Sequence, residues 1–127
     1  MLQQLDEVPW VDKRNLFLAG HSEGAITTSM FKGSQFRAYF ISAWTCTSGS
    51  PAFDRIHAPK DRPVLAVVGT NDEYHVGTFR ENDHCGMRMK GRPGSKSIVL
   101  EGWDHDVVAN RETIPSLVKF LQENIEQ

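Results

Sequence analysis

The sequence has 127 residues, of which 39% are hydrophobic, and we expect residues 1–127 to form a single domain with one modest core. Its 14 basic and 16 acidic residues are intermixed, which excludes the basic footprint of a protein that binds nucleic acid or an anionic membrane. No apolar stretch reaches membrane-spanning length, and residues 1–7 lack the order of a signal peptide. We therefore expect a soluble cytoplasmic protein whose partners are small neutral molecules.

The two cysteines, Cys46 and Cys85, are too few for a disulfide framework. They also lack the spacing of metal ligands. We expect both to be ordinary thiols.

The first strand-like run, residues 15–19, leads directly into Gly20-His21-Ser22-Glu23-Gly24, and a helix-compatible segment follows. A serine at a sharp turn from strand to helix is the pattern of a nucleophile elbow. Both glycines are expected where the strand and helix backbones nearly touch and a Cβ would collide. Ser22 would then lie at a helix N-terminus, where the backbone amide of Glu23 faces an oxyanion that forms on an attacked carbonyl.

Beyond the elbow we expect a helix over residues 23–32 that Gly33 ends, strands at 37–44, 64–68 and 97–100, a short helix around 50–57, and a less regular piece over 72–90. The strand runs are continuously apolar, which is typical of strands buried on both faces of a parallel sheet. The pattern predicts the α/β class, as a three-layer sandwich with a short, mainly parallel sheet of about four strands between flanking helices.

The last predicted helix is the clearest, because its apolar residues recur at helical spacing on one stripe: Ile114, Leu117, Val118, Leu121 and Ile125. Thr113 is expected to cap its N-terminus. Pro115 falls in the first turn, where its missing N–H costs nothing.

Two further residues follow predicted strands and complete a catalytic set with Ser22. In a parallel sheet, residues just past the strand ends converge at one edge, and Asp72 and His105 both occupy such positions. A serine hydroxyl needs a neutral imidazole to take its proton, and the imidazole needs a carboxylate on its other nitrogen. We therefore predict Ser22 as nucleophile, His105 as base and Asp72 as the acid that orients His105.

The sequence holds rivals for both roles. The other histidines are expected to be surface or packing residues, with His21 pointing away from Ser22; they are His21, His57, His75 and His84. Glu73 is the main rival for the acid, beside Asp83, Asp104 and Asp106. The run 104–106 predicts no metal site, because neighbouring ligands in one turn rarely converge.

These motifs resemble those of the C-terminal half of an α/β-hydrolase, of the dienelactone-hydrolase or small carboxylesterase type, from about residue 9 onward. The resemblance rests on residues 20–24, 69–72 and 102–105, in the family's chain order of serine, acid and histidine, and on residues 10–12 before the elbow strand. It implies a serine hydrolase of small carboxylic esters that forms an acyl-enzyme on Ser22 and uses no cofactor or metal.

The chain departs from that family before the elbow, where such hydrolases normally have several strands and a helix and this chain has only residues 1–9. The missing part usually supplies a second oxyanion-hole amide, so Glu23 is the one donor predicted and we expect weak activity. Residues 16–19 would form an apolar sheet edge without a protective charge. We therefore expect a homodimer or association with a complementary chain.

Two other functions remain open from the sequence. One is a non-catalytic or fragment subunit that assembles with another chain, and the other is the C-terminal part of a prolyl-oligopeptidase-type peptidase. The aromatic residues do not identify the substrate, since most are expected in the core: Trp44, Tyr74, Phe79 and Trp103.

Overall fold

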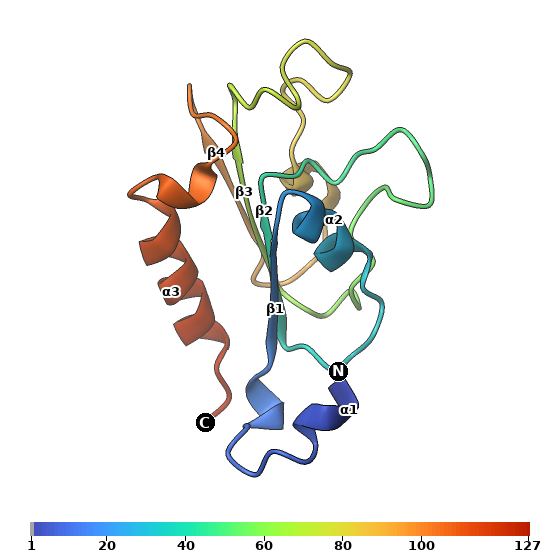
Figure 1. Cartoon of the computed structure of the whole chain (residues 1–127), viewed down its shortest axis with the longest axis vertical. Coiled ribbons are helices and arrows are strands. Elements are labelled where there is room, and N and C mark those ends of the chain that lie inside the picture. The colour runs from blue at the N-terminus through green and yellow to red at the C-terminus, as the bar shows by residue number, and fades with distance from the viewer. Residues whose placement is uncertain (1) are drawn as a thin grey trace.

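The computed structural model describes residues 2–127 as one parallel β-sheet with a helix on each face (Figure 1). The strands lie side by side in chain order and are all parallel: β1 (Phe17–His21), β2 (Ala38–Ser42), β3 (Val64–Gly69) and β4 (Lys96–Leu100). Helix α2 (Glu23–Met30) covers one face, and α3 (Thr113–Asn124) covers the other. The predicted α/β class and three-layer arrangement are confirmed.

Two apolar clusters, one on each face of the sheet, form the core. Along β2, Tyr39 and Ile41 pack on the side of α2, whereas Ala38 and Phe40 pack on the side of α3. Successive side chains of a strand point to opposite faces, so a strand covered on both faces needs a continuous apolar run. This is the physical basis of the pattern read from the sequence.

The first strand is less covered than the central ones. All residues of β2 and β3 are buried, whereas Ala19 and His21 of β1 are exposed. Within residues 2–127, β1 pairs with β2 alone, and α1 (Leu2–Leu5) lies beyond the N-terminal end of β1 rather than alongside it (Figure 1). The predicted sheet edge is therefore present.

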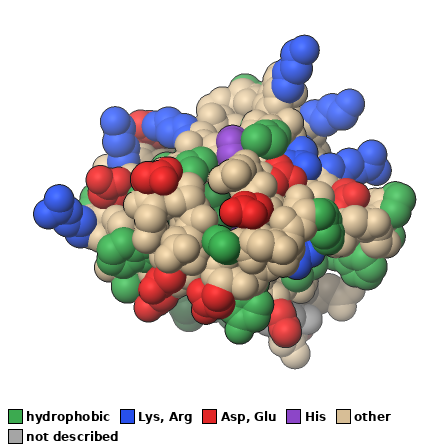
Figure 2. All heavy atoms as spheres, turned by 90° about the horizontal axis from the view of Figure 1, so that it is seen from above, with side chains coloured by type: hydrophobic (Ala, Val, Ile, Leu, Met, Phe, Trp, Pro, Cys, Tyr) green, Lys and Arg blue, Asp and Glu red, His purple; other side chains and the backbone are tan. Residues whose placement is uncertain are grey.

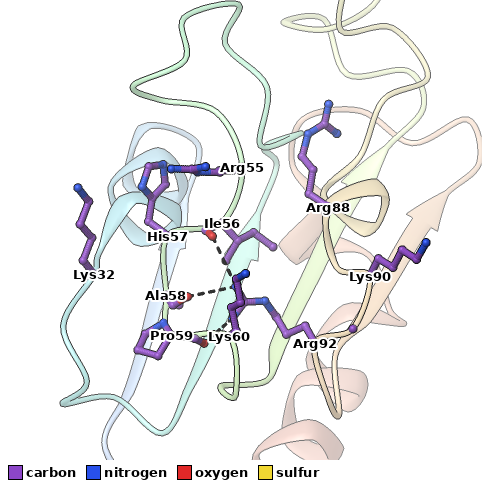
Figure 3. Close-up of a pocket in the computed structure, with 11 residues that line it drawn as sticks. Lys32, Arg55, Ile56, His57, Ala58, Pro59, Lys60, Arg88, Lys90 and Arg92 are labelled. Atoms are coloured by element: carbon purple, nitrogen blue, oxygen red, sulfur yellow. Dashed lines mark hydrogen bonds between the residues drawn. The ribbon is translucent and has the colours of Figure 1, made fainter.

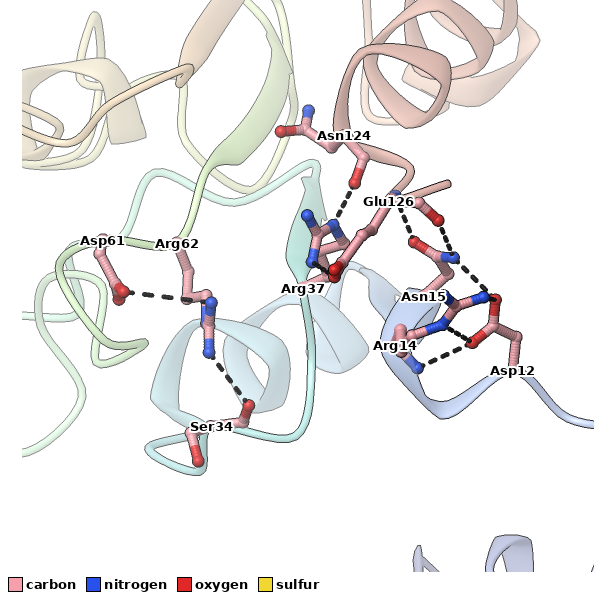
Figure 4. Close-up of polar contacts among 9 residues, drawn as sticks. All are labelled: Asp12, Arg14, Asn15, Ser34, Arg37, Asp61, Arg62, Asn124 and Glu126. Carbon is pink, nitrogen blue, oxygen red and sulfur yellow. Dashed lines mark hydrogen bonds and ion pairs between the residues drawn. The ribbon is translucent and has the colours of Figure 1, made fainter.

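Polar contacts join the segment before β1 to the C-terminal tail at the opposite end of the sheet from Ser22 (Figure 4). Asn15 donates to the Glu126 carbonyl at 2.8 Å and accepts from the Glu126 amide at 2.7 Å. Arg37, just before β2, pairs with the Glu126 carboxylate at 2.9 Å. These contacts fix the start of β1 against the end of the chain.

The prediction of a short helix around residues 50–57 is wrong. That stretch forms turns and bends, because the Asp54 carboxylate accepts from the amides of Ser48 and Gly49 and draws the chain into a loop. Helix α2 also ends at Met30, before the predicted stop at Gly33, since Phe31 is already extended.

The two cysteines form a disulfide in the structure, so the expectation of free thiols is wrong. The bond joins the segment after β2 to the 3-10 helix at Cys85–Arg88, across a sequence separation of 39 residues. Two cysteines from separate crossovers carry no spacing signal, and only the fold brings their Cα atoms to 5.0 Å.

Helix α3 buries only part of the predicted stripe. Phe120 and Thr113 are its buried residues, and Leu117 and Leu121 pack beside them, whereas Ile114, Val118 and Ile125 are exposed. Thr113 does not cap the helix. Its hydroxyl donates to the Val107 carbonyl at 2.5 Å, inside the core. No helix within residues 2–127 has the length and apolar composition to cross a bilayer.

Candidate active site

Ser22 lies at the apex of the turn between β1 and α2, at the carboxyl end of the sheet. Its φ of 58° and ψ of −117° fall outside the regions that L-residues normally adopt. Its amide donates to the Ser42 carbonyl at 2.9 Å, and its carbonyl accepts from the Ala25 amide at 3.0 Å. The turn is held by both sheet and helix, which is the elbow geometry that the sequence predicts.

The elbow brings strand and helix into backbone contact at Gly20. A Cβ there would lie 2.1 Å from the Gly24 carbonyl oxygen, so the predicted close approach is present. The close approach expected at Gly24 is absent, because an added Cβ there meets nothing within 4 Å. A second close approach occurs at Gly69, where a Cβ would lie 2.2 Å from the Trp103 carbonyl oxygen. This contact seats the loop that carries His105 against the end of β3.

Ser22, His105 and Asp72 form a continuous hydrogen-bonded chain. Nε2 of His105 lies 2.8 Å from Oγ of Ser22, and Nδ1 of His105 lies 2.6 Å from Oδ2 of Asp72. The Asp72 side chain is fully buried, whereas that of His105 is 17% exposed. The structure thus brings together the three residues predicted from separate strand ends, in the order that a nucleophile, a base and an orienting acid require.

The Asp72 carboxylate is fixed within the turn that follows β3. Its Oδ1 accepts from the Tyr74 amide at 2.9 Å, which leaves Oδ2 for His105. Glu73, the rival acid, is exposed. The structure therefore places Asp72, and not Glu73, against the imidazole.

A second imidazole reaches the same carboxylate, which the sequence analysis did not anticipate. Nδ1 of His75 lies 3.4 Å from Oδ2 of Asp72, and the His75 side chain is 7% exposed. Burial lowers the pKa of His75, although the negative charge of Asp72 opposes that shift. The spacing of three residues between Asp72 and His75 is the sequence signal that could have predicted this contact. A turn that starts at Asp72 brings residue 75 back to the side of the chain on which Asp72 lies.

A pocket of about 430 Å³ opens beside Ser22 and His105. Ile26 and Ala43 supply part of its apolar lining, and His21 lines it as well, although His21 was expected to point away from Ser22. The His21 and His105 rings lie 5.2 Å apart between centroids. In Figure 2, which looks onto this end of the molecule, a histidine side chain is visible near the centre of the face with hydrophobic and acidic side chains close to it.

The aromatic residues divide between core and pocket. Trp44 is buried and also borders the pocket, and Trp103 packs against the core beside α3. Tyr74 and Phe79 are 60% and 65% exposed, so the core role expected for them is wrong. Both lie in the irregular segment after β3, which runs over the surface. The Tyr74 ring lies 4.5 Å from that of His105.

Three buried nitrogen atoms around the pocket have no hydrogen-bond partner within residues 2–127: Trp44 Nε1, His75 Nδ1 and Arg80 Nε. The guanidinium of Arg80 lies over the Trp44 ring, 5.7 Å from its centroid. Of the three, Nδ1 of His75 lies 3.4 Å from the Asp72 carboxylate, whereas Trp44 Nε1 and Arg80 Nε have no acceptor among the described residues.

Two residues that line the pocket, Glu23 and Ala43, carry backbone amides at the ends of β1 and β2. The Glu23 amide belongs to the first turn of α2 and has no acceptor within the helix. The Ala43 amide already donates to the Val67 carbonyl at 2.8 Å. Of these two amides, that of Glu23 is the one without a backbone acceptor.

The acidic residues on either side of His105 face solvent. Asp104 and Asp106 are exposed, and the Asp104 carboxylate accepts from the Asp106 amide at 3.0 Å. Among the described residues, 2–127, no group of three or more His, Cys, Asp or Glu side chains is arranged to hold a metal ion.

Comparison with protein-family models and with curated proteins gives no match. Solved structures do match. SOBER1 of Arabidopsis thaliana is 14% identical, with a TM-score of 0.65, and the match covers 98% of this chain and 60% of that one. Esterase PE8 is 16% identical, with a TM-score of 0.64, and the match covers 98% of this chain and 57% of that one.

At this identity the likeness establishes the fold, which is that of the α/β-hydrolases. The chain spans about three fifths of the length of these structures. The described residues therefore correspond to part of that fold, which agrees with the resemblance to the C-terminal half of an α/β-hydrolase.

Proposed function

We propose that the chain is a serine hydrolase of small carboxylic esters, with Ser22 as nucleophile, His105 as general base and acid, and Asp72 as the residue that orients His105. The observation that carries this proposal is the hydrogen-bonded chain from Ser22 Oγ through His105 to Asp72, set on a strained strand-to-helix turn.

The reaction follows from the positions of these atoms. Nε2 of His105 takes the proton from Ser22 as Oγ attacks the carbonyl carbon of the ester, and the alcohol leaves with that proton. The resulting acyl-enzyme is broken by a water molecule that His105 deprotonates, which releases the acid and restores Ser22. Asp72 holds Nδ1–H of His105 throughout, so Nε2 faces the serine.

The Glu23 amide is the proposed donor to the oxyanion. Removal of one such donor typically lowers turnover about 100- to 1000-fold, so a hole with a single backbone amide predicts slow catalysis. We therefore expect measurable but weak activity from the chain alone.

The pocket supports a small substrate. Its volume of about 430 Å³ fits a compact ester. The unpartnered Trp44 Nε1 and Arg80 Nε favour a substrate with oxygen atoms beyond the scissile carbonyl. We propose a specificity of the dienelactone-hydrolase or small carboxylesterase type, on the motifs at residues 20–24, 69–72 and 102–105.

Hydrolysis of p-nitrophenyl acetate tests the proposal. Turnover by the wild-type chain should disappear in Ser22→Ala, while circular dichroism and thermal melting stay unchanged. Equal turnover in both proteins would contradict the assignment. No turnover in either would favour the non-catalytic subunit.

We also propose that the free edge of β1 pairs with another chain, and that a second copy is the simplest partner. The strand is apolar from Leu16 to Ala19, whereas the opposite edge strand, β4, begins with the exposed Lys96. An apolar edge without a charge or proline favours pairing with a second strand.

We propose that the protein is located in the cytoplasm. The Cys46–Cys85 disulfide argues against that location. Disulfides persist mainly in oxidising compartments. Alkylation of thiols at the moment of cell lysis, followed by mass measurement of the chain, decides between the cytoplasm and an oxidising compartment. Two alkylated cysteines would support the cytoplasm, and none would contradict it.

A further inference from the structure

A second pocket, of about 600 Å³, shares no lining residue with the pocket at Ser22 and lies beside the connections that precede β3 and β4 (Figure 3). Six of its lining side chains are cationic and none is a carboxylate: Lys32, Arg55, Lys60, Arg88, Lys90 and Arg92. They come from three separate segments, so the fold, and not a run in the sequence, brings them together. The net charge of −2 gives no sign of this concentration.

Five of the six cations of this pocket have no carboxylate partner within residues 2–127. Within residues 2–127, Arg88 pairs with Asp83 at 2.6 Å, but Lys32, Arg55, Lys60 and Lys90 make no ion pair or side-chain hydrogen bond. Outside the pocket, five cations pair with carboxylates: Lys13, Arg14, Arg37, Arg62 and Lys96. The pocket thus carries a local excess of positive charge.

Arg92 adds a fixed charge at the floor of the pocket. Its guanidinium donates to backbone carbonyls alone, among them those of Pro59 at 2.7 Å and Ala58 at 3.1 Å. Burial lowers the pKa of Arg92, because the charged form loses water there, although the nearby charge of Asp61 opposes that shift. A bound anion would supply the missing negative charge.

The shape of the pocket indicates what kind of anion fits. Lys32 and Arg55 lie on one side and Arg88 and Lys90 on the other, with Arg92 between them (Figure 3). We expect an anion with more than one charged group to reach both sides. Lysine and arginine are the usual partners of phosphate, and they make up most of the lining side chains. The one aromatic ring in the lining is that of His57, whose Nε2 lies 2.8 Å from the Asp54 carbonyl oxygen. The volume is that of a small-molecule site.

We propose that this pocket binds a small molecule that carries several phosphate groups, independently of the chemistry at Ser22. Because the contacts are between charges near solvent, affinity should fall as salt rises.

Isothermal titration with inorganic tripolyphosphate tests this proposal. We expect saturable binding at about 0.05 M salt that weakens several-fold at about 0.3 M. Orthophosphate, which spans one side only, should bind at least about tenfold more weakly. Equal affinity for the two anions, or no binding of tripolyphosphate at low salt, would overturn the proposal.

Matched variants locate the site. Lys32→Gln and Lys90→Gln remove exposed, unpaired charges, and each should weaken tripolyphosphate binding about fivefold. Lys119→Gln makes the same change on α3, on the other face of the sheet, and should leave the affinity unchanged. Equal losses in all three variants would mean unspecific attraction and would contradict a site. Ser22→Ala should bind as the wild type does, and a loss of binding there would place the anion at the other pocket.

Discussion

Ser22 and Asp72 follow strands with very different support. β3, which precedes Asp72, has a neighbouring strand on each side and is buried along all six residues. β1, which precedes Ser22, has a neighbour on one side only within residues 2–127, and two of its five residues are exposed. The proposed acid is thus held by the centre of the sheet. The proposed base follows the edge strand β4, but its loop rests against the end of β3 at Gly69, whereas the proposed nucleophile stands on the other edge. The alignment of Ser22 with His105 is therefore the less supported part of the site.

The largest effect is expected on the acid side. Asp72→Asn should lower turnover about 10⁴-fold without loss of the fold, because the amide no longer holds Nδ1–H of His105 and the wrong tautomer faces Ser22. Glu73→Gln is the matched control. It changes an exposed neighbour and should stay within about twofold of the wild type. The measurement is kcat with p-nitrophenyl acetate, and a larger loss in Glu73→Gln would reverse the assignment of the acid.

The ends of β1 and β3 should differ in how well they tolerate an added side chain. Gly69→Ala places a Cβ 2.2 Å from a backbone oxygen of the His105 loop, and we expect a loss of about 3 kcal/mol in the free energy of unfolding. Gly20→Ala makes a similar collision but should cost less, since β1 can shift toward its free side. Gly24→Ala, in open space on α2, should stabilise by about 0.5 kcal/mol.

Urea denaturation of these three variants measures the difference. If Gly20→Ala lowers the free energy of unfolding as much as Gly69→Ala does, or more, then β1 is held as firmly as β3.

The free edge should control assembly. Light scattering of the wild-type chain should give about twice its mass of 14.3 kDa, and Ala19→Lys on β1 should return it to a monomer, because a charge on an edge strand opposes pairing. Val99→Lys, on the opposite edge strand β4, is the control and should leave the dimer intact. A wild-type monomer with a cooperative melt would contradict the proposed pairing.

The smallest effect is expected from the second imidazole at Asp72. Burial lowers the pKa of His75 below its ordinary value of 6.5 in the folded chain, so the unfolded chain takes up that proton at higher pH than the folded chain does. Stability should therefore be complete above about pH 6.5 and fall as the pH drops toward the folded-state pKa.

Thermal melts between pH 7.5 and pH 5 check this dependence, in the wild type and in His75→Gln. The melting temperature of the variant should fall less between pH 7.5 and pH 5 than that of the wild type, because His75 no longer contributes to the decline. An identical decline in both proteins would show that His75 does not couple folding to pH.

The sequence predicted the parts of this molecule that depend on local pattern. Strand positions followed from apolar runs, and the elbow at Ser22 followed from a strand, two glycines and a helix in succession. Asp72 and His105 could be selected because parallel strands end at one edge, which turns a sequence position into a position in space.

Features that depend on long-range packing could not be predicted in the same way. The Cys46–Cys85 bond and the basic pocket join segments that only the fold brings together. On α3, apolar spacing alone could not show that Phe120 is buried while Ile114 and Val118 are exposed, because the choice of face depends on what lies against the helix.

The central claim is that His105 activates Ser22, and labelling with a fluorophosphonate tests it most directly. Mass spectrometry of the intact chain, followed by peptide mapping, should find one adduct per chain, located on Ser22. The labelling rate should fall by orders of magnitude in His105→Ala and Asp72→Asn, since the hydroxyl then lacks its base. An adduct on another residue, no adduct at all, or equal rates in the wild type and His105→Ala would contradict the account.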